Sequence, residues 1–70
     1  MTTEEKLKLI EEALRVKPGT LAVDTVLSTL REWDSLTILG LQVRLSAIKP
    51  DLKFDDLFGS NTAGDICDMV

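Results

Sequence analysis

The chain has 70 residues, of which 44% are hydrophobic, and this length allows one domain with a modest core over residues 1–70. Twelve acidic against eight basic residues give a net charge of −4, which argues against nucleic-acid binding because phosphate contacts need a basic patch. The chain has no histidine and one cysteine, which excludes an internal disulfide and a multi-cysteine zinc site.

The first predicted element is a helix in the segment TTEEKLKLIEEALRV, residues 2–16. Thr2 and Glu5 have the spacing of a capping box at its start. Apolar residues recur at helical spacing and predict a face toward the core: Leu7, Ile10 and Leu14. The segment KPGT, residues 17–20, is expected to end this helix because proline and glycine interrupt helical backbone.

Residues 19–33 are predicted to form a long ordered loop with one short helical turn near Ser28 to Leu30. A connection this long in a small domain usually has a function. Its apolar residues are expected to hold it against the core: Val23, Val26, Leu27 and Leu30.

A second helix is predicted to begin at Asp34 or Ser35, which are both good N-caps, and to run to about Ile48 before Pro50. The segment FDDLF, residues 54–58, predicts a short third helix. The last predicted helix opens at a second capping box, formed by Thr62 and Asp65. Its apolar residues Ile66, Met69 and Val70 are expected to face the core. No segment alternates with the period of a strand, so the expected fold class is all-α: a small bundle of three main helices plus one short helix.

The second helix carries two apolar stripes rather than one. With about 100° per residue, one side holds Ile38, Leu41, Leu45 and Ile48. The opposite side holds Leu36, Leu39, Val43 and Ala47, with Gly40 beside them. A small bundle covers only one such stripe well, so we expect the core to bury the first and the second to remain exposed as a partner surface.

Few residues of this chain could support catalysis. A serine nucleophile needs a neighbouring base, and Ser35 has neither a histidine nor a lysine nearby in sequence. The carboxylates are expected to be solvated on polar faces, no glycine-rich phosphate loop is present, and Asp51, Asp55 and Asp56 lack calcium-loop spacing. We therefore expect no enzyme and no metal site. The longest apolar stretch is too short for a membrane span, which predicts a soluble cytoplasmic protein without stable membrane insertion.

The segment WDSL, residues 33–36, follows the long loop and precedes the apolar helix, and it resembles the Asp-Ser-Leu signature of acyl carrier proteins. The resemblance covers nearly the whole chain, because the first helix, the loop, the signature, the short helix and the last helix follow in the family's order. It implies that Ser35 carries a 4′-phosphopantetheine arm, supplied from coenzyme A by a phosphopantetheinyl transferase. It also implies that Asp34 and Leu36, on either side of Ser35, belong to the site of the arm. Asp34 would cap the helix and aid recognition by the transferase, and Leu36 would be the exposed leucine that partner enzymes contact.

The family also implies a set of partners. A carrier of this kind, a monomer, holds acyl intermediates as thioesters on the arm and presents them to acyl-transferring and acyl-modifying enzymes of fatty-acid or polyketide-type biosynthesis. The expected partner-binding residues are Leu36, Leu39, Gly40, Val43 and Arg44.

The second helix departs from the family pattern in its charge. Family members often carry acidic residues along this helix, whereas residues 35–50 contain no acid and two bases, Arg44 and Lys49. This departure favours a specialised carrier over the general carrier of fatty-acid synthesis. Two alternatives remain open: an aminoacyl or peptidyl carrier, and an unmodified helical interaction domain in which Ser35 is only an N-cap.

Overall fold

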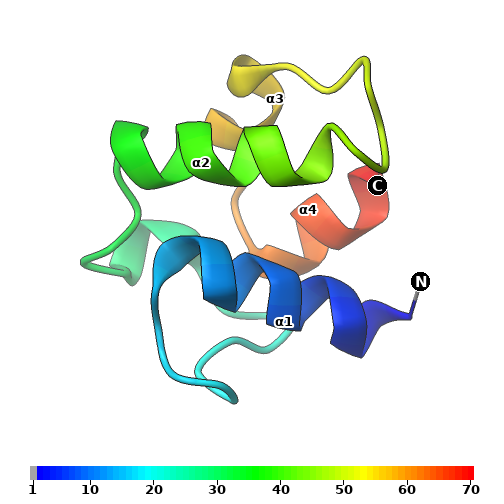
Figure 1. The fold of residues 1–70 in the computed structure, drawn as a ribbon. Coiled ribbons are helices and arrows are strands. Elements are labelled where there is room, and N and C mark those ends of the chain that lie inside the picture. Colours follow the sequence, from blue (N-terminus) through cyan, green and yellow to red (C-terminus); the bar gives the residue numbers. More distant parts are fainter. Residues whose placement is uncertain (1) are drawn as a thin grey trace.

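The computed structural model describes residues 2–70, which fold into four α-helices and one 3-10 helical turn (Figure 1). The helices are α1 (Thr3–Leu14), α2 (Ser35–Leu45), α3 (Phe54–Phe58) and α4 (Ala63–Met69). The turn η1 (Leu27–Thr29) lies in the connection between α1 and α2. Residues 2–70 contain no β-strand, and the prediction of a small helical bundle is confirmed.

Helix α1 begins as predicted and ends earlier than predicted. The Thr2 hydroxyl accepts a hydrogen bond from the Glu5 N–H at 3.2 Å, and the Glu5 carboxylate accepts one from the Thr2 N–H at 3.2 Å. The helix ends at Leu14 because Arg15 adopts the left-handed conformation, with φ of 60°. The Val16 N–H then donates to the Glu11 carbonyl at 3.1 Å, a bond typical of such helix ends. The KPGT segment therefore follows the end of α1 and does not cause it.

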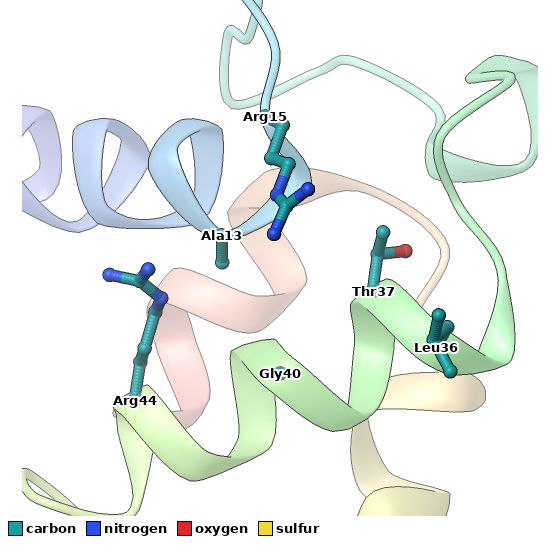
Figure 2. A pocket seen from close by; sticks show the side chains of 6 residues that line it. All are labelled: Ala13, Arg15, Leu36, Thr37, Gly40 and Arg44. Carbon is teal, nitrogen blue, oxygen red and sulfur yellow. The ribbon is translucent and has the colours of Figure 1, made fainter.

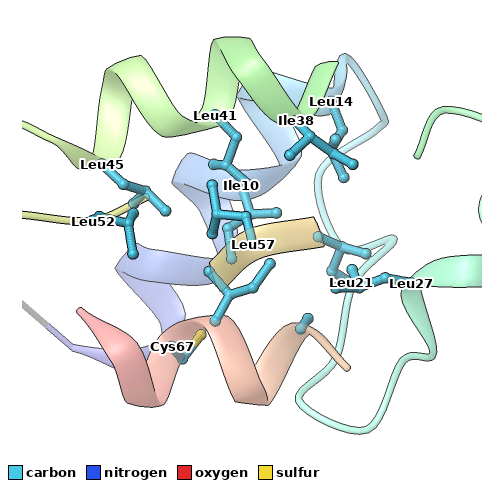
Figure 3. Packing of buried hydrophobic residues seen from close by; sticks show 12 residues of the cluster. Ile10, Leu14, Leu21, Leu27, Ile38, Leu41, Leu45, Leu52, Leu57 and Cys67 are labelled. Carbon is cyan, nitrogen blue, oxygen red and sulfur yellow. The ribbon is translucent and has the colours of Figure 1, made fainter. Parts of the chain in front are cut away.

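The core lies between the four helices (Figure 3) and contains the predicted stripe of α2. Its buried apolar residues are Ile10, Leu14, Leu21, Leu27, Ile38, Leu41, Leu45, Leu52, Leu57, Ala63, Ile66 and Cys67. The prediction was wrong for Ile48, which is exposed because α2 ends at Leu45 and the chain turns away. Met69 and Val70 are partly buried against the core, and the Lys6 ammonium donates to the Val70 carbonyl at 2.7 Å. That bond holds α1 to the end of α4.

The connection between α1 and α2 is held by apolar side chains in the core and by backbone hydrogen bonds. The prediction that its apolar residues contact the core is confirmed for Leu27 and Leu30 and wrong for Val23 and Val26, which are exposed. The Val23 carbonyl instead accepts from the Gly64 N–H at 2.9 Å, and Val26 forms an isolated antiparallel bridge with Thr62. These bonds join the loop to the start of α4 without burying either valine side chain.

Glu11 is an exception to the expectation that the acids are solvated. It lies on the core side of α1, only 5% of its surface is exposed, and its carboxylate accepts a hydrogen bond from the Leu21 N–H at 2.9 Å. A buried backbone N–H needs a partner, because leaving it unpaired costs free energy. Glu11 therefore satisfies the backbone of the loop where Leu21 enters the core.

We expect Glu11→Ala to lower the free energy of unfolding by about 1–3 kcal/mol, because the buried Leu21 N–H loses its acceptor. Urea denaturation would measure the change. Glu11→Gln is the matched control, because its amide oxygen can still accept the same bond and should retain most of the stability. Equal losses in the two variants would contradict this role for the side-chain oxygen.

Candidate functional site

Asp34, and not Ser35, caps helix α2. The Asp34 carboxylate accepts a hydrogen bond from the Thr37 N–H at 2.9 Å, and the Asp34 N–H donates to the Thr37 hydroxyl at 3.2 Å. Ser35 is thus the first residue of the helix, and it is exposed. The structure does not support the interpretation of Ser35 as an N-cap, because its neighbour forms the capping box.

Thr37 also fixes the turn that leads into α2. Its hydroxyl donates to the Glu32 carbonyl, while the Trp33 N–H donates to the Leu30 carbonyl at 3.2 Å. The first bond connects the end of the long loop to the first turn of the helix, and the second closes a turn within the loop. The role of Thr37 was not predicted, although the Asp-x-x-Thr spacing around Ser35 is a signal for its capping bonds with Asp34.

The capping carboxylates share one electrostatic property. The hydrogen bond from the Thr37 backbone, which stabilises the charged form, lowers the pKa of Asp34 below its ordinary value of 3.8. Backbone hydrogen bonds lower the pKa of Glu5 and of Asp65 in the same way, through Thr2 and Thr62 respectively. Asp34 therefore carries its negative charge next to Ser35 at neutral pH.

Acidification is expected to destabilise the domain through these caps. A lowered carboxyl pKa contributes stability that is present above the ordinary pKa and is lost as the pH falls through the folded-state value. The ordinary values are 4.5 for Glu5 and 3.8 for Asp34 and Asp65, so urea midpoints should begin to fall as the pH approaches these values and should continue to fall below them. Asn is also a good cap but does not titrate, so the double variant Asp34→Asn, Asp65→Asn should show a shallower fall. An unchanged slope would show that other carboxylates are responsible.

The second apolar stripe of α2 is exposed, as predicted. Leu36, Leu39 and Val43 expose 80%, 51% and 67% of their surfaces, and Gly40 and Arg44 beside them are also exposed. The stripe begins directly after Ser35 and runs along the length of the helix. Helix α2 thus has one face in the core and an opposite apolar face whose leucine and valine side chains are at least half exposed.

A pocket of about 280 Å³ lies between α1 and the first three turns of α2 (Figure 2). Its lining residues are Ala13, Arg15, Leu36, Thr37, Gly40 and Arg44. Leu36, Gly40 and Arg44 were predicted as surface residues, whereas Ala13 and Arg15 were not part of any predicted site. Arg15, the left-handed residue that ends α1, is one of the lining residues, and the sequence contains no local signal for that conformation.

No family model, curated protein or solved structure matches the chain. The chemistry of the site therefore rests on its geometry. It combines an exposed serine hydroxyl at the positive end of a helix, an exposed apolar stripe and a pocket with two guanidinium groups.

Residues 2–70 contain no group of three or more acidic or cysteine side chains placed to hold a metal ion. Within the same residues no helix is long and apolar enough to cross a membrane.

Proposed function

We propose that this protein is an acyl carrier protein with an acyl-carrier-like fold, in which Ser35 carries a 4′-phosphopantetheine arm. The supporting observation is the position of Ser35, which is the first residue of α2 and is exposed. Asp34 caps the helix, so the Ser35 hydroxyl is not used as the cap. A group that must be reached by several enzymes needs such exposure. The sequence order around the Asp-Ser-Leu signature agrees with this assignment.

The residues around Ser35 suit a phosphodiester. In the attachment step the Ser35 Oγ forms a bond to the pantetheine-bearing phosphorus of coenzyme A, and the P–O bond to the second phosphate breaks. Adenosine 3′,5′-bisphosphate leaves, and the serine proton passes to a base of the transferase. The new negative charge then lies at the N-terminus of α2, where the helix dipole favours anions. The attached arm supplies a terminal thiol that holds an acyl group as a thioester.

Cys67, the protein's own thiol, is a poor site for the acyl group. Its side chain is buried in the core, and burial raises the pKa of the thiol. A thiol that is buried and protonated reacts slowly, because the thiolate is the nucleophile. Acyl transfer therefore depends on a thiol outside the folded chain, as an attached arm would provide.

One mass measurement tests the proposal. The purified chain is incubated with coenzyme A and a promiscuous phosphopantetheinyl transferase, and its intact mass is recorded. We expect a gain of one phosphopantetheinyl group, together with one thiol that reacts quickly with a thiol reagent in the folded protein. Cys67 should react only after unfolding. A chain that gains no mass is not a carrier.

The exposed stripe is proposed as the surface that partner enzymes contact. No carboxylate flanks Leu39 or Val43 on α2, so docking should depend more on apolar contact than on charge. Val43→Asp is expected to raise the KM of the transferase for the carrier about tenfold, because a charge must then be desolvated at the interface. Since Val43 is 67% exposed, the free energy of unfolding should change by less than about 0.5 kcal/mol.

Val23→Asp is the matched control for this prediction. Val23 is also exposed, but it lies in the connection that is bonded to α4, away from the stripe. The KM of the transferase for the Val23→Asp carrier should equal its KM for the unchanged protein.

We further expect binding to a dedicated enzyme to change little between low and moderate salt, because screening weakens charge pairs and not apolar contacts. A steep loss of affinity with salt would assign docking to charged residues instead.

A further inference from the structure

The pocket between α1 and α2 has a positive charge in an acidic protein. Two of its six lining residues are arginines and none is acidic, although the chain has a net charge of −4. Figure 2 shows the Arg15 guanidinium reaching from the end of α1 toward the gap between the helices, and the Arg44 guanidinium reaching from α2 toward α1. The lining therefore supplies two cations and no carboxylate to neutralise them.

Ser35 lies on another flank of α2. With about 100° per residue, the four lining residues of this helix, which are Leu36, Thr37, Gly40 and Arg44, span about 100° of its circumference. Ser35 lies outside that span, about 100° beyond Leu36 and on the side away from Thr37. The phosphate of an arm on Ser35 would thus leave α2 away from the two guanidinium groups, which remain available to a different anion.

The pocket opens onto the exposed apolar stripe. Leu36 belongs to both, Gly40 and Arg44 of the lining lie beside the stripe, and both arginines are exposed. A Cβ atom added at Gly40 would meet no other atom within 4 Å, so the space above this residue is free. A protein that covers the stripe would therefore also cover the pocket and remove water from its two guanidinium groups.

Covering these arginines restricts what the partner can carry. A charged group that loses its water without gaining an opposite charge is costly, so an uncharged or basic surface would bind poorly here. A carboxylate offsets this cost, because its two oxygens match the planar donors of a guanidinium group. The pocket volume of about 280 Å³ is below the range of about 300–1,000 Å³ typical of sites for drug-sized ligands, which suits one side chain.

We propose that this pocket receives an aspartate or glutamate side chain of the protein partner that docks on the stripe. The inference rests on the proposed role of the stripe as the partner surface of a carrier. It reverses the polarity expected from the family resemblance, because here the carrier supplies the cations and the partner supplies the acid. An ion pair enclosed between two proteins is screened less than an exposed one, so the pair adds selectivity to apolar docking without a steep dependence on salt.

The first experiment selects binders of the stripe without assuming their charge. A phage-displayed library of three-helix domains, randomised on one face, is selected on the unchanged chain and depleted on the Val43→Asp variant, so that only binders that need the stripe remain. The net charge of −4 disfavours acidic binders in general, so an excess of acids reports the local charge of the pocket. We expect an acidic residue to be enriched at one position of the randomised face, relative to the unselected library.

The second experiment pairs that acid with the pocket. Replacing the acid of a selected binder by its amide should raise the Kd for the unchanged chain at least about tenfold, because two covered guanidinium groups lose their counter-charge. The same replacement should change the Kd for the double variant Arg15→Gln, Arg44→Gln less than about twofold. Lys8→Gln is the matched control, because it removes an exposed positive charge of α1 outside the pocket and should keep the full effect.

Far-UV circular dichroism verifies that each variant is folded. If the double variant does not fold, Arg44→Gln alone leaves the end of α1 intact and should still reduce the effect of the amide replacement. Two outcomes would overturn the assignment of the pocket: binders that need the stripe but show no excess of acids, or an equal rise in Kd for the unchanged chain and the arginine variant. The mass gain at Ser35 is measured separately, so the carrier function would then remain.

A library that yields no binder excluded by Val43→Asp would overturn the stripe as a docking surface, and the inference about the pocket with it. A chain that gains no arm would instead overturn the carrier function.

Discussion

Ser35→Ala is expected to abolish attachment of the arm completely. The Ser35 hydroxyl is the nucleophile in the proposed transfer, and alanine has no atom that can replace it. The fold should remain, because Asp34 caps α2 and alanine is the best helix former. The intact mass after incubation with coenzyme A and the transferase should therefore equal that of the untreated variant, while far-UV circular dichroism stays unchanged.

Three other serines are the controls for this variant. The Ser46 hydroxyl donates to the Val43 carbonyl at 2.7 Å, and the Ser60 hydroxyl donates to the Asp56 carbonyl at 2.9 Å. Ser28 is exposed, but it lies in η1 without an aspartate before it or a leucine after it. Ser28→Ala, Ser46→Ala and Ser60→Ala should each gain one arm, as the unchanged chain does. A mass gain in Ser35→Ala would disprove the assignment of the site.

Local signals in the sequence were sufficient to predict much of the fold. The Thr2/Glu5 and Thr62/Asp65 capping boxes form as predicted, because each depends only on residues three positions apart. The two stripes of α2 could be separated for a similar reason, since the 3.6-residue period fixes which side chains share a face. The choice of the buried stripe agreed with the structure: Ile38, Leu41 and Leu45 are in the core.

The features that the sequence did not reveal depend on contacts between distant segments or on a single backbone conformation. Glu11 has the sequence context of a solvated acid, and only the packing of the loop onto α1 gives its carboxylate the Leu21 N–H as a donor. Arg15 is a residue type that seldom adopts positive φ, so its left-handed conformation has no local signal. The pocket could not be predicted because its lining residues Arg15 and Arg44 are 29 positions apart and share one pocket only in the folded chain.

The burial of Leu41 leads to the largest predicted loss of stability. Its side chain is fully buried on α2 and points into the same space as Ile10 of α1 (Figure 3). Leu41→Ala should lower the free energy of unfolding by about 2–5 kcal/mol, because the apolar contacts are lost and a cavity remains. Domains typically have only about 5–15 kcal/mol of stability, and a 70-residue domain buries a small share of its surface, so urea denaturation should show a much lower midpoint.

Leu36→Ala is the matched control, because it makes the same chemical change on the same helix at a side chain that is 80% exposed. The free energy of unfolding of Leu36→Ala should differ from that of the unchanged protein by no more than about 0.5 kcal/mol. If Leu41→Ala does not fold, Ile38→Val removes one methyl group from the same buried stripe and should cost about 0.5–1.5 kcal/mol. Comparable losses at Leu36 and Leu41 would mean that both faces of α2 contribute to the core. The apolar stripe after Ser35 would then not be available to a partner, since the domain itself would need it for stability.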